Sequence, residues 1–550
     1  MNNIVEHSPL NIKLTDDQQK IYDKMMEFLK SVQEQEILLT SAAGTGKTTL
    51  VTKFINGVIK DKICNKVVVA APTHKAVNIA KSKLFSTNEK ITISSNIDIM
   101  TVHRLLGYQN FINNSGEVYY AKGTFDSNWT IYDLVVVDEC SMLSNQIIDD
   151  IGNELKKEIN KKIKVIYVGD PAQLPPVNQN ESKIFKKKNI KKLSLEKIIR
   201  TKSNKIMELS NAHRKWIETC KTKDMPTIAK YVSENIILYS NNSTEKWLEK
   251  FINYLKTDCI KKTENEDNNI FDDTLNNNII LTWTNKKCNT YNDYVRRKMF
   301  NKKELDRYEK GEILIFNDFH RILKEAVDGT NNPIEEIISF YTSEQVKLID
   351  MTQNEFQFQK IKNLRNNELP QNISDYFVKT ISEINKTLSN TKLAVYYMNI
   401  QKISDLNKEE TPIYQILCIH QNSEGEYSAL KEYFEEYMVK LKNNTYKMVY
   451  ELKNEKNIEK SILNMSKVEY LSIIEKKINR IWKDWQVNVI DRFAQLNYGY
   501  AITVHKSQGS TFKNVFLDIQ DIFKNPNEPE KIKCLYTSLT RSSHSLELLV

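Results

Sequence analysis

Uninterrupted apolar runs recur through the N-terminal part of the chain and again in its second half. The clearest occupy residues 36–41, 66–71, 132–137 and 164–168, and each leads into a polar stretch. Runs of this length without strict alternation are typical of strands buried on both faces of a parallel sheet. A run at residues 278–282 has the same character. Strands that alternate with helices predict an α/β fold built on parallel sheets.

A small insertion interrupts this alternation at residues 107–131. The turn signal at 113–116 lies between Phe111 and the apolar-aromatic run 118–120, with Trp129 further on. This pattern predicts a hairpin. An exposed aromatic hairpin could act as a wedge, or it could simply pack its own aromatic side chains, and the sequence favours neither.

A larger insertion, residues 301–494, lacks this rhythm. Residues 311–317 and 340–346 are typical of strands of a small β-barrel. Residues 428–442 predict an amphipathic helix, because apolar side chains recur there at helical spacing. We expect that stripe to pack in a core.

Composition narrows the class of protein. A chain of 550 residues exceeds the ~250–300 residues at which single cores stop growing, so several domains are expected. Its 79 Lys and Arg residues against 70 Asp and Glu give a net charge of +9, which permits a polyanionic partner. Seven cysteines without a Cys-x-x-Cys pair predict free thiols and no zinc site. No secretory signal and no apolar run of ~18 residues are present, so we expect a soluble, intracellular protein without a membrane partner.

The strand at 36–41 breaks into a loop of small residues, after which Lys47 and Thr48 open a helix. Small residues let backbone N–H groups close around phosphate oxygens, and the helix N-terminus adds unpaired N–H groups. Lys47 is placed to reach the β- and γ-phosphates, and Thr48 to ligate Mg²⁺. The usual first glycine of this loop is Ser41 here. The predicted nucleotide contacts are Ala43, Gly44, Thr45, Gly46, Lys47, Thr48 and Thr49.

Four further features fit binding and hydrolysis of a nucleotide. Gln18, just inside a predicted helix start, carries an amide that can pair with both a donor and an acceptor of adenine. Asp138 and Glu139 end a buried strand, so Asp138 is expected to hold Mg²⁺ and Glu139 to polarise the attacking water. Gln173, in a proline-rich loop, has the reach to sense a γ-phosphate. Arg200 follows as a candidate charge neutraliser.

Polar and basic residues gather at two other helix starts of the same region. Their hydroxyl, imidazole and ammonium groups suit the phosphates of a nucleic-acid backbone. The candidates are Pro72, Thr73, His74, Lys75, Thr101 and His103.

The order of these motifs resembles superfamily 1 helicases over about 200 residues. The form Gly169-Asp170-Pro171-Ala172-Gln173-Leu174-Pro175-Pro176 resembles the 5′-to-3′ branch, superfamily 1B, whose Dda-type and RecD-type helicases are the most similar. The resemblance implies two RecA-like lobes that sandwich Mg-ATP and alternately grip single-stranded DNA.

The second half of the chain extends the resemblance. Residues 278–292 are similar to helicase motif IV, 498–512 to motif V and 535–541 to motif VI. Motif V implies contacts of His505 and Lys506 with DNA and of Gln508 and Gly509 with the nucleotide, and motif VI implies an arginine finger at Arg541. The other implied DNA contacts are Thr284, Asn285 and Asn292.

The resulting hypothesis is a monomeric, ATP-dependent DNA helicase that moves 5′ to 3′ and binds single-stranded DNA and its junctions with duplex. Single-strand-binding or replication proteins are its expected partners. A protein-displacing translocase, an RNA helicase and a nucleotide-gated binding subunit are the alternatives. The expected segments are RecA-like domain 1A (1–106 and 132–203), hairpin insertion 1B (107–131), RecA-like domain 2A (204–300 and 495–550) and an SH3-like and helical insertion 2B (301–494).

Overall fold

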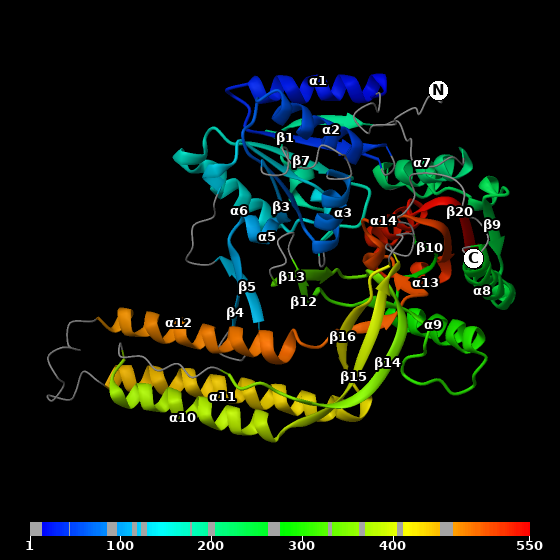
Figure 1. The fold of residues 1–550 in the computed structure, drawn as a ribbon. Coiled ribbons are helices and arrows are strands. Elements are labelled where there is room, and N and C mark those ends of the chain that lie inside the picture. The colour runs from blue at the N-terminus through cyan, green and yellow to red at the C-terminus, as the bar shows by residue number, and fades with distance from the viewer. Residues whose placement is uncertain are drawn as a thin grey trace, which may run out of the picture.

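The computed structural model describes residues 14–42, 45–84, 96–112, 118–122, 129–176, 179–195, 204–219, 221–261, 276–327, 333–361, 369–403, 411–451 and 466–550 (Figure 1). Within these residues the chain forms two lobes, each built on a parallel sheet, and an insertion with its own sheet and helices. The predicted α/β fold is confirmed.

The first lobe is a six-stranded parallel sheet with strand order β3-β2-β6-β7-β1-β8. Its strands are β1 (Glu36–Ser41), β2 (Val67–Ala71), β3 (Ile97–Thr101), β6 (Leu134–Val137), β7 (Lys164–Gly169) and β8 (Lys191–Leu195). Successive strand residues point to opposite faces, so the apolar runs fill two cores. One core packs α1 (Asp16–Lys30), α2 (Lys47–Lys60) and α3 (His74–Leu84), and the other packs α5 (Val102–Leu105) and α6 (Asn145–Lys156).

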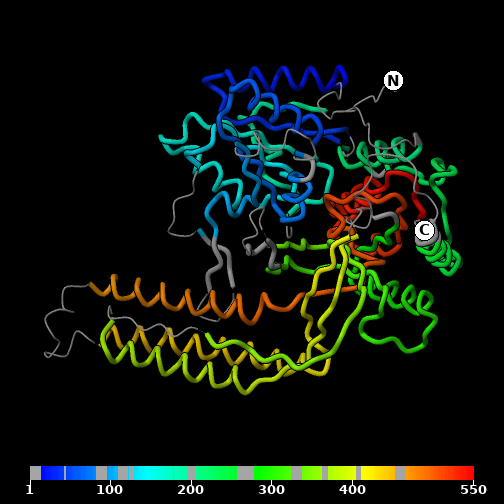
Figure 2. Tube along the Cα trace, in the orientation of Figure 1, coloured from blue at the N-terminus to red at the C-terminus, as the bar shows by residue number. Residues whose placement is uncertain are grey.

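The second lobe is a five-stranded parallel sheet with strand order β18-β10-β19-β20-β9. Its strands are β9 (Ile236–Tyr239), β10 (Asn276–Thr282), β18 (Ala501–Thr503), β19 (Phe512–Asp518) and β20 (Ser542–Leu549). On one face lie α7 (Asn204–Thr219), α13 (Ile519–Phe523) and α14 (Glu528–Leu539), and on the other α8 (Thr244–Lys261) and α9 (Asn285–Phe300). Figure 2 shows how the green and red parts of the chain meet in this lobe, although the insertion separates them in sequence.

The insertion starts from an antiparallel sheet with strand order β16-β15-β14-β11-β17. Its strands are β11 (Ile313–Phe316), β14 (Gln345–Gln357), β15 (Lys392–Lys402), β16 (Tyr414–Ile419) and β17 (Leu496–Tyr498), and β12 (His320–Val327) with β13 (Pro333–Phe340) forms a separate hairpin. Strands β14 and β15 lead to an elongated bundle of α10 (Gln371–Asn390), α11 (Glu424–Glu451) and α12 (Lys467–Trp485), which lies below the first lobe in Figure 1.

Two details of the insertion differ from the sequence prediction. Residues 340–346 are not one strand, because Ser343 adopts a φ of 63° and the chain turns there between β13 and β14. The Glu344 N–H closes the turn by donating to the Tyr341 carbonyl at 2.8 Å, and the Ser343 N–H ties it to β11 by donating to the Phe316 carbonyl at 2.7 Å. The antiparallel sheet also includes β17, beyond the expected end of the insertion at residue 494.

The predicted small hairpin consists of β4 (Tyr108–Ile112) and β5 (Val118–Lys122). At its base the Tyr108 hydroxyl donates to Asp150, and Lys122 pairs with Glu154 at 3.2 Å. Trp129 is fully buried in the first lobe rather than exposed on the hairpin. The turn at 113–116 lies outside the described residues.

No helix among the described residues is both long and apolar enough to cross a membrane.

Candidate nucleotide and nucleic-acid site

The phosphate loop joins β1 to α2, as the sequence predicts. Gly46 has a φ of 76°, a left-handed conformation that glycine adopts without strain, and the first turn of α2 has no side-chain cap. The backbone N–H groups of this first turn are therefore available to an anion. Thr45 is buried and donates to the Ala42 carbonyl at 3.0 Å, while Thr48 and Thr49 lie in the first turn. Ala43 and Gly44 are outside the described residues.

Ser41, which replaces the usual glycine, ends β1. Its hydroxyl oxygen is buried and has no hydrogen-bond partner within the described part of the chain. The departure from the usual loop therefore places a polar atom beside the phosphate loop.

Lys47 lies between the two acidic residues that follow β6. Its ammonium nitrogen is 3.7 Å from an Asp138 carboxylate oxygen and 3.9 Å from one of Glu139. Burial alone would lower the pKa of Lys47, but Glu139 and Asp138 outweigh it and raise that pKa. The three side chains thus meet at one point of the sheet edge, and the lysine stays charged.

Glu139 has a φ of 50°, a left-handed conformation that is strained for a glutamate. Its backbone N–H donates to the Asp138 carboxylate at 2.9 Å. This turn sets the direction of both carboxylates. A hydroxyl from Thr48 and a carboxylate from Asp138 are the hard oxygen donors that Mg²⁺ prefers, so these residues fit the predicted ion.

Gln18 lies against the phosphate loop. It is buried, its amide nitrogen donates to the Thr45 carbonyl at 3.2 Å, and its amide oxygen accepts from the Thr15 N–H at 3.1 Å. In this structure the amide therefore ties α1 to the loop. Its contact with adenine stays a prediction.

The loop after β7 joins the two lobes. Asp170 is fully buried and accepts from the Arg214 guanidinium at 2.8 Å and from the Tyr536 hydroxyl at 2.9 Å. Arg214 lies on α7 and Tyr536 on α14, both in the second lobe. Gln173, in the same loop, is also buried, and its N–H donates to the Asp170 carbonyl at 3.2 Å.

Two more hydrogen bonds hold this loop to the second lobe. The Leu174 N–H donates to the Thr537 hydroxyl at 3.3 Å, and the Gln508 amide donates to the Leu174 carbonyl at 3.4 Å. Gly509 follows with a φ of 76°, and a Cβ there would lie 3.6 Å from Ile79 of α3. The motif V loop therefore touches the first lobe.

Arg541 is buried in the second lobe. Its guanidinium donates to the Thr537 carbonyl at 3.0 Å and to the Ser510 carbonyl at 3.1 Å, which links α14 to the motif V loop. Besides burial, its charge also lowers the pKa of Lys75 in the first lobe, so Arg541 lies near the boundary between the lobes. Its action as an arginine finger stays a prediction, and Arg200 is outside the described residues.

The candidate nucleic-acid residues of the two lobes meet at this boundary. Lys75 donates to the Lys506 carbonyl at 3.4 Å, and Lys506 donates to the Asn317 side chain at 3.0 Å. Burial and then Arg541 lower the pKa of Lys75 to about 8, against a smaller opposing effect of Glu344. The Nε2 atom of His505 lies 3.5 Å from a carboxylate oxygen of Glu530.

The hydroxyls of the first-lobe candidates serve as helix caps. Thr73, which follows the half-buried Pro72, accepts from the Ala76 N–H at 3.2 Å, and Thr101 accepts from the Arg104 N–H at 3.2 Å. His74 is exposed at the start of α3. The His103 ring lies 5.5 Å from the Tyr108 ring, at the base of the hairpin.

Asn292 was predicted to contact DNA, and this prediction is wrong. Its side chain is buried and exchanges two hydrogen bonds with the Ala501 backbone, at 3.1 and 2.8 Å. Thr284 is half-buried, caps α9 through the Lys287 N–H at 3.2 Å and contacts Asp521. Asn285, the first residue of α9, is exposed.

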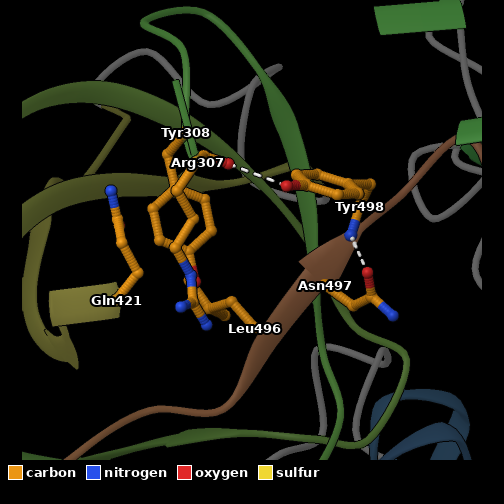
Figure 3. Close-up of a pocket in the computed structure, with 6 residues that line it drawn as sticks. All are labelled: Arg307, Tyr308, Gln421, Leu496, Asn497 and Tyr498. Carbon is orange, nitrogen blue, oxygen red and sulfur yellow. Dashed lines mark hydrogen bonds between the residues drawn. The ribbon is translucent and has the colours of Figure 1, made fainter. Parts of the chain in front are cut away.

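A separate hollow of about 350 Å³ lies where β17 meets the insertion (Figure 3). Figure 3 shows the Tyr498 hydroxyl donating to the Arg307 carbonyl, a bond of 2.9 Å. The Arg307 guanidinium is paired with Glu424. None of the predicted site residues lines this hollow.

Two parallel-sheet lobes that meet beside one phosphate loop are an arrangement typical of P-loop motor ATPases. Within the chain, residues 26–179 match the family model described as AAA domain, and residues 498–549 match the UvrD-like helicase C-terminal domain.

Curated relatives cover most of the chain. Uncharacterized protein R530 of Acanthamoeba polyphaga mimivirus is 29% identical over 97% of this chain and 99% of its own length. The RecBCD enzyme subunit RecD of Buchnera aphidicola from Schizaphis graminum is 25% identical over 93% of this chain and 70% of its own. The ATP-dependent DNA helicase dda of Enterobacteria phage T4 is 25% identical over 61% and 67%. The chain is therefore similar to superfamily 1B DNA helicases of the Dda and RecD type.

Proposed function

We propose that this protein hydrolyses Mg-ATP between its two lobes, moves 5′ to 3′ along single-stranded DNA and so separates duplex strands in replication, recombination or repair. The observation that carries the proposal is the join between the lobes at Asp170. The loop that accepts bonds from Arg214 and Tyr536 of the second lobe also carries Gln173. A change at the γ-phosphate can therefore alter the contact between the lobes.

The geometry of the first lobe supports the hydrolytic roles that we propose for Lys47 and Glu139. Lys47 exchanges its carboxylate partners for the β- and γ-phosphates, and Glu139 polarises the attacking water. Thr48 and Asp138 would hold Mg²⁺, which would neutralise phosphate charge there. Gln173 senses the γ-phosphate, and Arg541 and Arg200 neutralise the developing charge. An arginine finger contributes about 10³–10⁵ in rate in other nucleotide hydrolases.

The proposed DNA-binding residues lie at the boundary between the two lobes. Lys75 and His74 of the first lobe and Lys506 and His505 of the second offer basic groups to the phosphates of one strand. Opening and closing of the lobes would shift one group of contacts relative to the other. The 5′-to-3′ direction rests on the resemblance of residues 169–176 to superfamily 1B and not on the chemistry of these residues.

We further propose that the protein acts as a monomer on junctions between single-stranded and duplex DNA, alongside single-strand-binding or replication proteins. Such a monomer contains every residue of the proposed cycle, since both lobes come from one chain.

The test is ATP-dependent strand separation of two duplexes, one with a 5′ single-stranded tail and one with a 3′ tail. The proposal expects unwinding from the 5′ tail only. Glu139→Gln should abolish unwinding while it keeps nucleotide binding, because the amide cannot polarise the attacking water.

Each other outcome contradicts a defined part of the proposal. Unwinding from the 3′ tail alone would overturn the direction. DNA-stimulated ATP hydrolysis without strand separation would indicate a translocase, and a preference for RNA duplexes would indicate an RNA helicase. Binding without hydrolysis would indicate a nucleotide-gated subunit.

A further inference from the structure

The insertion reaches the first lobe through the loop between β11 and β12. Phe319 of this loop stacks on His74, with ring centroids 4.3 Å apart and planes 16° apart. His74 begins α3 in the first lobe, whereas β11 and β17 connect the insertion to the second. The two rings therefore lie across the boundary between the lobes.

This stack differs from the structural aromatic stack next to it. Phe316 and Phe340 lie 4.6 Å apart at 15°, and both are fully buried in the core of the insertion. Phe319 is only half-buried, and His74 is exposed. Because it is partly exposed, the stack of Phe319 on His74 contributes little to the stability of a hydrophobic core. A role in ligand binding would explain the parallel arrangement of the two rings.

Cationic and polar groups surround Phe319. The Arg321 guanidinium carbon lies 4.7 Å from the centre of its ring, and the Tyr341 ring lies 5.6 Å away. On the other side of the loop, Asn317 accepts from Lys506, whose carbonyl accepts from Lys75. The loop thus combines an aromatic face with the basic residues proposed to bind the DNA backbone.

We propose that Phe319 is a base-stacking platform, which the insertion contributes to the single-stranded DNA site. In this structure the His74 ring covers the face of Phe319 on which a base would stack. When DNA binds, one base enters between the two rings, and Arg321 faces the neighbouring phosphate. This inference rests on the proposed function, because it requires the strand to follow the boundary between the lobes.

Stacking on an aromatic side chain tolerates any base, because every base has a π face. That property suits an enzyme that moves along a strand of arbitrary sequence. Because the two rings belong to different lobes, their separation would change as the lobes open and close, and the base would be held in one state and released in the other.

The test compares the affinity of the full chain for two oligonucleotides by fluorescence anisotropy. One is oligothymidine, and the other has the same backbone with abasic units in place of the nucleotides. Phe319→Ala should weaken oligothymidine binding about fivefold to tenfold, the lower part of the range for one stacked base, because the His74 contact must be given up. Binding of the abasic strand should change less than about twofold, since stacking contributes nothing there.

Further variants separate stacking from a structural effect. Phe319→Tyr keeps the ring and should bind both strands like the wild type, whereas Phe319→Leu keeps apolar bulk and should behave like the alanine variant. Phe523→Ala is the matched control, because Phe523 is 38% exposed on α13 and also has a lysine, Lys531, 5.8 Å from its ring centre. It should leave the affinity for both strands unchanged.

Three results would overturn the inference. They are equal weakening of both strands by Phe319→Ala, wild-type affinity of that variant for oligothymidine, and retention of affinity by Phe319→Leu. If a variant gives any of these results while the wild-type protein separates 5′-tailed duplexes, the proposed function stands and only the platform is removed. Wild-type protein that binds no single-stranded DNA would remove both.

Discussion

Asn292 shows how a single residue can mislead a sequence prediction. The resemblance to motif IV implied a DNA contact, yet Asn292 lies in the middle of α9, where the helix packs against β18. There one side-chain amide satisfies both the N–H and the carbonyl of Ala501. The neighbouring Asn285 has the same side chain and is exposed. Sequence alone could not separate them, because the two lie seven residues apart on nearly the same face of α9, and only the packing of the helix on the sheet covers its middle while it leaves its first turn exposed.

Asn292→Ala should therefore destabilise the protein without weakening its grip on DNA. Loss of one amide would leave two backbone groups unpaired in a buried place, at a cost of about 1–3 kcal/mol. The measurement is the thermal unfolding midpoint, together with the affinity of the folded protein for oligothymidine. Asn285→Ala is the control and should have the opposite profile, with unchanged stability and weaker binding. Unchanged stability of Asn292→Ala would contradict the structural role.

At the scale of elements, the loop after β7 is joined to α7 and α14. The strand and the proline-rich loop could be predicted from the sequence, and so could the place of Gln173 within it. The partners of Asp170 could not. Arg214 stands in an amphipathic helix without a motif, where an arginine ordinarily faces solvent, and only the arrangement of the lobes brings it to Asp170. Tyr536 lies within motif VI, so the sequence predicted that it lies near the nucleotide site but not that it binds Asp170.

Arg214→Gln should reduce the stimulation of ATP hydrolysis by DNA more than it reduces hydrolysis without DNA. The substitution leaves the Asp170 carboxylate buried without its cation, so the loop that carries Gln173 loses its fixed place against the second lobe. We expect a loss on the order of tenfold, or about 1.4 kcal/mol, because the Arg214 side chain is 20% exposed and solvent screens part of the pair.

The control for this prediction is Glu218→Gln. Glu218 also pairs with Arg214, at 3.2 Å, but its side chain is 63% exposed, so its removal should change little. The readout is the ratio of DNA-stimulated to basal kcat, with KM for ATP measured alongside. Equal ratios in the two variants would show that the bond to Asp170 does not couple the lobes.

At the scale of the whole molecule, basic groups from both lobes lie together with few acidic partners. Burial and then the nearby Arg541 disfavour the charged form of Lys75, and among the described residues Glu344 acts in the opposite direction. A lysine beside another cation is an expected consequence of a site whose anion is supplied by a ligand. The phosphates of a DNA strand would provide that anion. The sequence predicted both basic motifs, but their meeting depends on the docking of the two lobes.

Binding of single-stranded DNA should therefore weaken as pH rises through the pKa of Lys75, which is about 8. Below that pH the ammonium is charged and holds a phosphate. Above it the free protein loses the proton and must regain it to bind, so affinity should fall about tenfold between pH 7 and about pH 9. The pKa values of His74, His103 and His505 are all lowered, chiefly because neighbouring atoms keep water from part of each ring, so these side chains are neutral throughout that range. Lys75→Arg keeps its charge and should bind with little dependence on pH. A titration of affinity in which the arginine variant shows the same loss as the wild type would assign the pH dependence to another group and place the DNA phosphate away from Lys75.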